Sequence, residues 1–149
     1  MNLREFLIEA KKNTYASEGE ENETELGNGG KELVFEEDEF RYRDRYFGFN
    51  PFSGQEVVWR GGEPFWSMNY RGETLSSSVS AEKIYSFLQK ALNQVEEDQP
   101  FRGPEVFVKE DFKYSNRFEG NIRSFEGKEE IFYKGEKVYE LLYHGGVVD

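Results

Sequence analysis

The chain has 149 residues, a length that suits one domain, 1–149, built around one hydrophobic core. It contains no cysteine, which excludes a disulfide framework, a thiolate metal site and a cysteine nucleophile. Its 19 basic and 30 acidic residues give a net charge of −11, which argues against direct nucleic-acid binding because phosphate contacts need clustered Lys and Arg.

The N-terminal stretch MNLREFLIEAKK predicts a helix over residues 2–13. Asn2 and Glu5 have the spacing of a capping box, and one face carries Leu3, Phe6, Leu7 and Ala10. No apolar run here is long enough for a signal peptide or a membrane span. We therefore expect a cytoplasmic protein that does not contact a membrane and requires no cofactor.

Residues 17–30 read SEGEENETELGNGG, with five glutamates, four glycines and almost no apolar side chain. This composition predicts a mobile acidic loop. A calcium-binding loop is the alternative, but the spaced aspartates and late glutamate of such loops are missing.

Two hairpins are predicted between residues 31 and 71. In the first, a turn at Glu37-Asp38 would place Phe35 opposite Phe40 and Leu33 opposite Tyr42, all on one face.

The second hairpin covers residues 54–71 and turns at Gly61-Gly62, which places Arg60 opposite Glu63. Its apolar face would then carry Val57, Trp59, Trp66, Met68 and Tyr70. Its other face would carry Glu56, Ser67 and Asn69 beside Val58 and Phe65.

Apolar residues at helical spacing predict a second helix over residues 80–95, capped by Ser78 or Ser80. A linker over residues 95–105 leads into a C-terminal meander of three or more strands. Turns at Glu126-Gly127 and Lys134-Gly135 would align Ile122, Ile131 and Val138, place Arg123 opposite Glu130, and put Leu142 and His144 on the Val138 face.

These elements predict an α+β fold in the order α-β-β-β-β-α-β-β-β. We expect a strongly bent or twisted antiparallel sheet of about seven strands, with both amphipathic helices packed on one face.

The segment FRYRDRY, residues 40–46, sorts its side chains by strand alternation. Phe40, Tyr42, Asp44 and Tyr46 share one side, and Arg41, Arg43 and Arg45 share the other. Asp44 on an aromatic face must be paired, hydrogen-bonded or raised in pKa. It could serve as a pocket acid, a base or a ligand anchor, or it could be a structural carboxylate. The arginines are best interpreted as a solvated, salt-bridged face rather than a nucleic-acid platform.

Two further groups could contribute chemistry. Glu56, with Ser67 and Asn69, could orient a ligand or lie on the surface. His144, in Y-H-G-G, is the single histidine, so a multi-histidine metal site is excluded and no metal site is expected. It could exchange protons with a carboxylate or have a structural role. The common nucleotide, zinc-protease and hydrolase motifs are absent from the sequence.

The chain resembles a widespread prokaryotic family known as domain of unknown function 5680. The resemblance covers nearly the whole chain and rests on four ordered blocks, FLIEAKKNTYAS, YRDRYFGFNPFSGQEVVW, PFWSMNYRG and FEGKEEIFYKGEKVYELLYHGG. The segment FRGPEVF departs from the glycine-rich segment expected between them. The resemblance implies no catalytic or binding residues. Some members carry an N-terminal helix-turn-helix, which we do not expect in this chain and which suggests a sensing or effector role.

These observations lead to three functional hypotheses. The first is a small-molecule-binding or regulatory domain, whose candidate site residues are Tyr42, Asp44, Tyr46, Glu56, Trp66, Asn69, Tyr70 and His144. The second is an enzyme that uses Asp44 or Glu56 with His144 as acid–base partners. The third is an interaction protein that forms a homodimer through a sheet face or edge.

Overall fold

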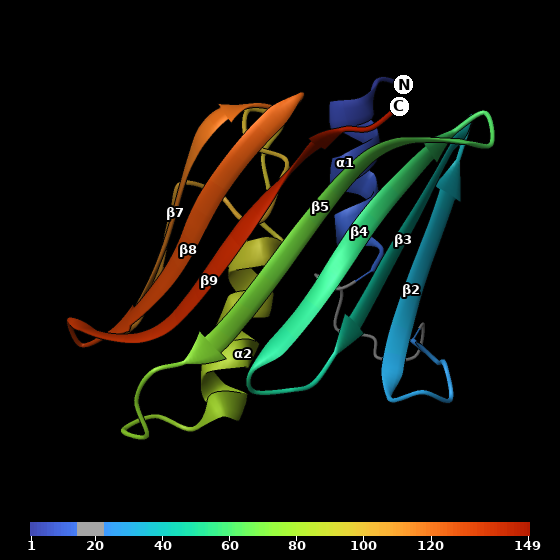
Figure 1. The fold of residues 1–149 in the computed structure, drawn as a ribbon. Coiled ribbons are helices and arrows are strands. Elements are labelled where there is room, and N and C mark those ends of the chain that lie inside the picture. Colours follow the sequence, from blue (N-terminus) through green and yellow to red (C-terminus); the bar gives the residue numbers. More distant parts are fainter. Residues whose placement is uncertain (15–22) are drawn as a thin grey trace.

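The computed structural model describes residues 1–14 and 23–149. Within these ranges it has two helices, α1 (Leu3–Lys12) and α2 (Ala81–Leu92), and nine strands (Figure 1). The strands are β1 (Thr24–Glu25), β2 (Gly30–Glu37), β3 (Phe40–Phe47), β4 (Phe52–Arg60), β5 (Glu63–Thr74), β6 (Val106–Lys109), β7 (Phe112–Asn121), β8 (Ser124–Tyr133) and β9 (Glu136–Val147). Neither helix has the length and apolar character needed to cross a membrane.

All nine strands form one antiparallel sheet in the order β1-β2-β3-β4-β5-β9-β8-β7-β6. Strands β5 and β9 pair at the centre and join two meanders. The sheet ends at β1 on one side and at β6 on the other. Figure 1 shows both helices on the same face of this open sheet.

The predicted α+β class with two helices is confirmed, but the prediction of a strongly bent or twisted sheet of about seven strands is wrong in its strand number and its curvature. The described chain has nine strands, and the sheet is not strongly curled. The additional strands β1 and β6 are too short to give a period-two pattern. Of the predicted acidic loop, residues 17–22 lie outside the described residues, Thr24–Glu25 pair as β1, and Gly30 begins β2.

Both helices begin where their capping residues predict. Asn2 and Glu5 form the reciprocal capping box of α1, and the Ser80 side chain accepts the Lys83 N–H at the start of α2. Each helix turns its apolar face toward the sheet.

The first hairpin differs from its predicted register by two residues. Phe35 lies opposite Tyr42, and Leu33 lies opposite Asp44. The turn therefore uses Asp38-Glu39, where Asp38 adopts a positive φ of 55° that aspartate tolerates better than most residues. Because the shift is even, the predicted faces are kept.

A β-bulge in the second hairpin changes which side chains of β5 share a face with Glu56. The Gly61-Gly62 turn and the pair of Arg60 with Glu63 are confirmed. Beyond them, Phe65 is an extra residue, so Val58 pairs with Trp66 and Glu56 with Met68. One extra residue exchanges the two faces of a strand relative to its partner. Ser67 and Asn69 consequently lie on the side opposite Glu56, contrary to the prediction.

The C-terminal meander contains one predicted turn and one that was misplaced. Lys134-Gly135 is a turn, whereas Glu126 and Gly127 lie within β8 and the first turn is at 122–123. Gly127 is needed for packing, because a Cβ there would lie 2.6 Å from a ring carbon of Tyr143.

The alignment predicted for this meander is wrong as well. Ile131 lies opposite Tyr139, and Arg123 is in the turn rather than opposite Glu130. Val138 is the extra residue of a second bulge, so Leu142 and His144 are exposed instead of sharing its buried face.

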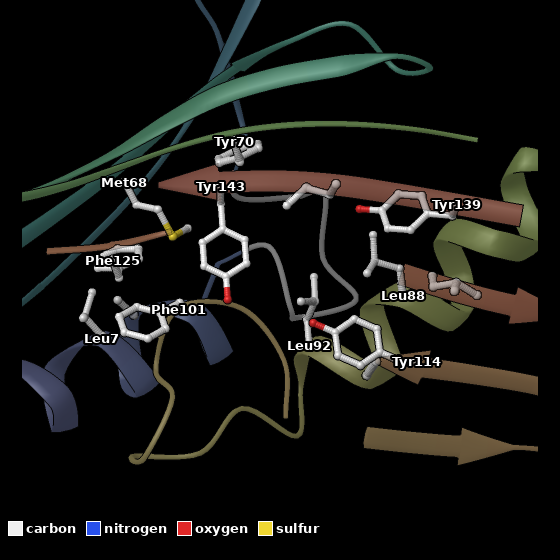
Figure 2. Close-up of a cluster of buried hydrophobic side chains, with 14 of the residues drawn as sticks. Leu7, Met68, Tyr70, Leu88, Leu92, Phe101, Tyr114, Phe125, Tyr139 and Tyr143 are labelled. Atoms are coloured by element: carbon white, nitrogen blue, oxygen red, sulfur yellow. The ribbon is translucent and has the colours of Figure 1, made fainter. Parts of the chain in front are cut away.

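The core fills the space between the sheet and the two helices. Figure 2 shows side chains from α1, α2 and the central strands meeting there, together with Phe101 from the segment after α2. Phe101 stacks on Phe125 with ring centroids 4.0 Å apart. The predicted linker over residues 95–105 is therefore partly core: Phe101 is 1 % exposed.

We expect Gly145→Ala to destabilise the fold strongly, because a Cβ there would lie 2.8 Å from the Met68 Cα and would also overlap the Ser67 carbonyl oxygen. The added methyl would force the central β5–β9 pair apart, at a cost of about 2 kcal/mol or more in the free energy of unfolding. Leu142→Ala, on the exposed face of the same strand, should change it by less than about 0.5 kcal/mol. Urea unfolding of the two variants measures this, and equal losses would contradict the role of Gly145.

Candidate functional site

The candidate site is built around two carboxylates that face each other across neighbouring strands. Asp44 on β3 lies directly opposite Glu56 on β4, and both side chains point to the helix-covered face. Asp44 is 2 % exposed and Glu56 is fully buried. Like charges in this arrangement destabilise a strand pair.

Asp44 has a strongly perturbed environment. Burial, and after it the charge of Glu56, raise the pKa of its carboxyl group to about 7, although the Tyr70 hydrogen bond and the charges of Arg102 and Lys11 oppose the shift. The Tyr70 hydroxyl donates a 2.6 Å hydrogen bond to Asp44 Oδ1. Among the described residues, no basic side chain forms an ion pair with Asp44.

Glu56 is neutralised by a lysine from α1. Lys11 Nζ lies 3.1 Å from Glu56 Oε1, and both side chains are completely buried. The Lys11 ammonium also donates to the Phe101 carbonyl oxygen. Burial lowers the pKa of Lys11, and the charge of Glu56 opposes that change.

A second buried ion pair lies beside the first. Arg102, in the segment after α2, donates from Nε and Nη2 to the two oxygens of Glu129 at 3.1 and 2.9 Å. The hydroxyls of Tyr114 and Tyr139 donate to the same carboxylate at 2.5 and 2.7 Å. This pair therefore has the full set of hydrogen bonds that a buried salt bridge requires.

The buried charges of the described residues do not balance. Lys11 and Arg102 are the two cations, and Asp44, Glu56 and Glu129 are the three carboxylates. Since each cation has a carboxylate of its own, Asp44 is the acid left over. Burial is the largest cause of its raised pKa, and the charge of Glu56 adds to it.

Asp44 also lines a cavity of about 380 Å³ between α2 and the inner face of β2–β5. The deepest lining residues are buried, and they give way to half-buried and exposed ones toward the mouth. The lining consists of Thr14, Glu23, Leu33, Asp44, Tyr46, Gly48, Phe49, Phe52, Tyr70, Glu82, Tyr85, Ser86, Leu88, Gln89, Leu92 and Arg102.

Gly54 makes room for the hydroxyl that contacts Asp44. Tyr70 on β5 lies opposite Gly54 on β4, and its ring crosses the position that a side chain would occupy. A Cβ at residue 54 would also lie 2.7 Å from the Arg45 carbonyl oxygen. The absent side chain thus allows Tyr70 to lean over β4 toward β3.

The structure brings together part of the predicted site. Asp44, Tyr46 and Tyr70 line the cavity, and Glu56 lies next to Asp44 beneath it. Tyr42 and Trp66 are fully buried core residues that do not line the cavity.

The other two predicted residues lie elsewhere. Asn69 pairs with His144 in the β5–β9 register, and both side chains occupy the sheet face away from the helices. His144 therefore does not meet Asp44 or Glu56 as an acid–base partner, because strand alternation and the bulge at Val138 turn it outward.

Sequence reasoning did not assign three charged residues of the network. Lys11 follows the apolar face of α1 at four residues from Leu7, a signal that the helical period could have revealed. Glu129 shares its strand face with Ile131, but the misplaced turn concealed this relation. Arg102 lies in a segment without periodicity, so no sequence pattern marks it.

Two of the three arginines on the outer face form the predicted salt bridges. Arg45 pairs with Glu32 at 2.5 Å, and Arg41 pairs with Glu36 at 3.5 Å. The Arg43 guanidinium lies 4.9 Å from the ring centre of Trp59.

Comparison with known proteins gives one family. A family model described as "Domain of unknown function (DUF5680)" matches residues 44–148. No curated protein and no solved structure shows significant similarity to the chain.

We expect the stability contribution of Asp44 to depend on pH. A carboxyl group with a raised pKa keeps its proton to higher pH in the native state than in the unfolded chain, so the free energy of unfolding falls as pH rises from about 4 to about 7. Asp44→Asn removes this loss. Urea unfolding at pH 4.5 and pH 8 measures this effect. From the lower to the higher pH, the free energy of unfolding of the variant should rise relative to that of the wild type by up to a few kcal/mol. The exposed Asp98→Asn should show no such trend, and a pH-independent difference for Asp44→Asn would contradict the assignment.

The Lys11–Glu56 pair is expected to show strong coupling. Lys11→Met leaves a buried carboxylate without its cation and should cost about 3 kcal/mol or more, and Glu56→Gln should also destabilise the fold. The double variant, which leaves neither charge alone, should lose clearly less than the sum of the two single losses. Urea unfolding of all three variants measures the coupling. Additive losses would show that the two charges do not depend on each other.

Proposed function

The chain belongs to the DUF5680 family, and we propose that it binds a small molecule in the cavity between α2 and the inner face of the sheet. The observation that carries this proposal is the position of Asp44, a buried carboxylate outside both ion pairs, on the wall of a cavity of about 380 Å³. Ligand pockets have volumes of roughly 300–1,000 Å³, with apolar walls and a few converging polar groups.

The composition of the walls supports binding. Aromatic side chains from β3, β4, β5, α2 and the loop after β3 surround the space, namely Tyr46, Phe49, Phe52, Tyr70 and Tyr85. Leu33, Leu88 and Leu92 add aliphatic surface on the buried side. Contact between these walls and an apolar ligand removes apolar surface from water, which favours binding, and the buried polar groups can fix the orientation of the ligand.

The energetic cost of Asp44 also favours a functional role. A carboxylate beside Glu56 in a buried site weakens the fold at neutral pH, and an amide or apolar residue would avoid that cost. Perturbed titratable groups in clefts are typical of binding and catalytic sites.

A regulatory role follows if the ligand couples two layers of the fold. Leu88, Gln89 and Leu92 belong to α2, whereas Leu33, Asp44 and Tyr70 belong to the sheet. A ligand that contacts both layers favours one position of α2 over others, and a ligand acts on a conformational equilibrium through such differential contacts. We infer a sensor-type module in which α2 reports occupancy of the cavity.

A second candidate function is acid–base catalysis by Asp44 without His144. The specific observation is the pKa of about 7, which suits proton transfer near neutral pH, in a carboxyl group that a ligand in the cavity can reach. Recovery of a bound compound in chemically altered form would favour catalysis over sensing.

We expect fragments to bind in the cavity and to be excluded when its mouth is filled. An NMR screen of small aromatic fragments, both charged and neutral, should shift amide signals of residues that line the cavity. Ser86→Trp places a large ring at the mouth and should abolish these shifts. Lys90→Trp, on the exposed side of the same helix, should leave them unchanged. Hits that bind Ser86→Trp as well as the wild type, or a screen that shifts no cavity residue, would contradict the proposal.

A further inference from the structure

We propose that the ligand is a small organic cation, a protonated amine on a compact aromatic or aliphatic body, and that the Asp44 carboxylate binds its ammonium group. This inference rests on the proposed function and specifies the chemistry of the same cavity.

The charges around the cavity favour a cation. Of the described residues in its lining, Glu23, Asp44 and Glu82 are acidic, and Arg102 is the single basic residue. The Arg102 guanidinium is engaged by the Glu129 carboxylate through two hydrogen bonds. Glu23 is engaged as well, because Lys31 Nζ lies 3.8 Å from its Oε2 and the Tyr46 hydroxyl donates to its Oε1. Among the described lining residues, Asp44 and Glu82 are the carboxylates that form no ion pair, and both favour a cation over an anion.

The buried ion pairs leave a place for one positive charge. Lys11 pairs with Glu56, and Arg102 pairs with Glu129. Asp44 accepts a hydrogen bond from Tyr70 but has no ion-pair partner among the described residues. An ammonium group in the cavity would bring the buried positive and negative charges to three each and would satisfy an ionised Asp44.

A continuous series of aromatic rings leads from the surface to Asp44. Phe49 is 57 % exposed, and its ring meets Tyr85 edge-on at a centroid distance of 5.0 Å. Tyr85 contacts Phe52 at 5.7 Å, and Phe52 contacts Tyr70 at 6.1 Å. Ring faces attract ammonium groups, and this attraction is stronger where water is excluded.

A metal ion fits this site less well than an organic cation. No group of three His, Cys, Asp or Glu side chains that could hold a metal ion occurs in the described part of the chain. A single carboxylate with aromatic walls instead matches an ammonium group, which needs one anionic partner and gains from ring faces.

Three compounds of similar shape and different charge test the inference. Benzylamine, which is protonated at pH 8, benzyl alcohol and benzoate are titrated calorimetrically into the protein at that pH, where Asp44 is largely ionised. Benzylammonium should bind at least about tenfold more tightly than benzyl alcohol, and benzoate should bind most weakly. Asp44→Asn should remove the preference for the cation while it keeps binding of the alcohol.

Two controls separate the site from general electrostatics. Glu82→Gln removes an exposed carboxylate at the mouth and should weaken benzylammonium binding by less than about threefold, because exposed charges interact weakly through water. The unfolding midpoint of Asp44→Asn shows whether that variant is folded. Tyr85→Leu removes an aromatic ring from the cavity wall. It should weaken the binding of benzylammonium more than the binding of benzyl alcohol.

The possible outcomes distinguish the two levels of the proposal. If benzyl alcohol or benzoate binds as tightly as benzylammonium, or if Asp44→Asn keeps the cation preference, the cation assignment is wrong and the cavity remains a binding site. If other fragments occupy the cavity while benzylammonium does not, the assignment is likewise overturned. If no fragment of the NMR screen reaches the cavity, the proposed function itself fails.

Discussion

The opposition of Asp44 and Glu56 across β3 and β4 is the constraint on which the inner face of this protein depends. Two carboxylates in one buried cross-strand pair cannot both ionise without cost. Lys11 from α1 forms an ion pair with Glu56, whereas Asp44 lies beside the cavity without such a partner among the described residues. The fully bonded pair of Arg102 and Glu129 shows that this chain can balance a buried charge completely. The incomplete balance at Asp44 is therefore the feature that a function must explain.

Departures from regular strand geometry create this arrangement. The extra residue Phe65 exchanges the two faces of β5 relative to β4, so Trp66, Met68 and Tyr70 share the inner face with Glu56. Gly54 lets the Tyr70 ring cross β4 and reach Asp44. The bulge at Val138 then turns His144 to the opposite side of the sheet. Without the extra residue Phe65, Trp66, Met68 and Tyr70 would lie on the sheet face opposite Asp44 and Glu56, and the Tyr70 hydroxyl would not reach Asp44.

Local signals predicted most of the fold but only part of the site. Caps and apolar periodicity located both helices, and the turn at Gly61-Gly62 located the central hairpin. The bulges carry no distinct sequence signal, and one unpaired residue reverses every later position on a strand, which is why Glu56 and His144 were placed on the wrong faces. Asp44 was found because its strand is regular over FRYRDRY. Arg102 was not predicted, because the segment after α2 is buried by long-range packing and has no local sequence pattern that indicates burial.

The unbalanced charge at Asp44 is tested most directly by a carbon-13 NMR titration of its side-chain carboxyl carbon, with and without saturating benzylammonium. We expect a midpoint near pH 7 in the free protein, because burial and Glu56 both disfavour the ionised form. Bound benzylammonium should lower that midpoint clearly, since an adjacent positive charge stabilises the carboxylate. A midpoint near pH 4 in the free protein, or one that benzylammonium leaves unchanged, would contradict the claim that Asp44 is the unbalanced charge awaiting a cation.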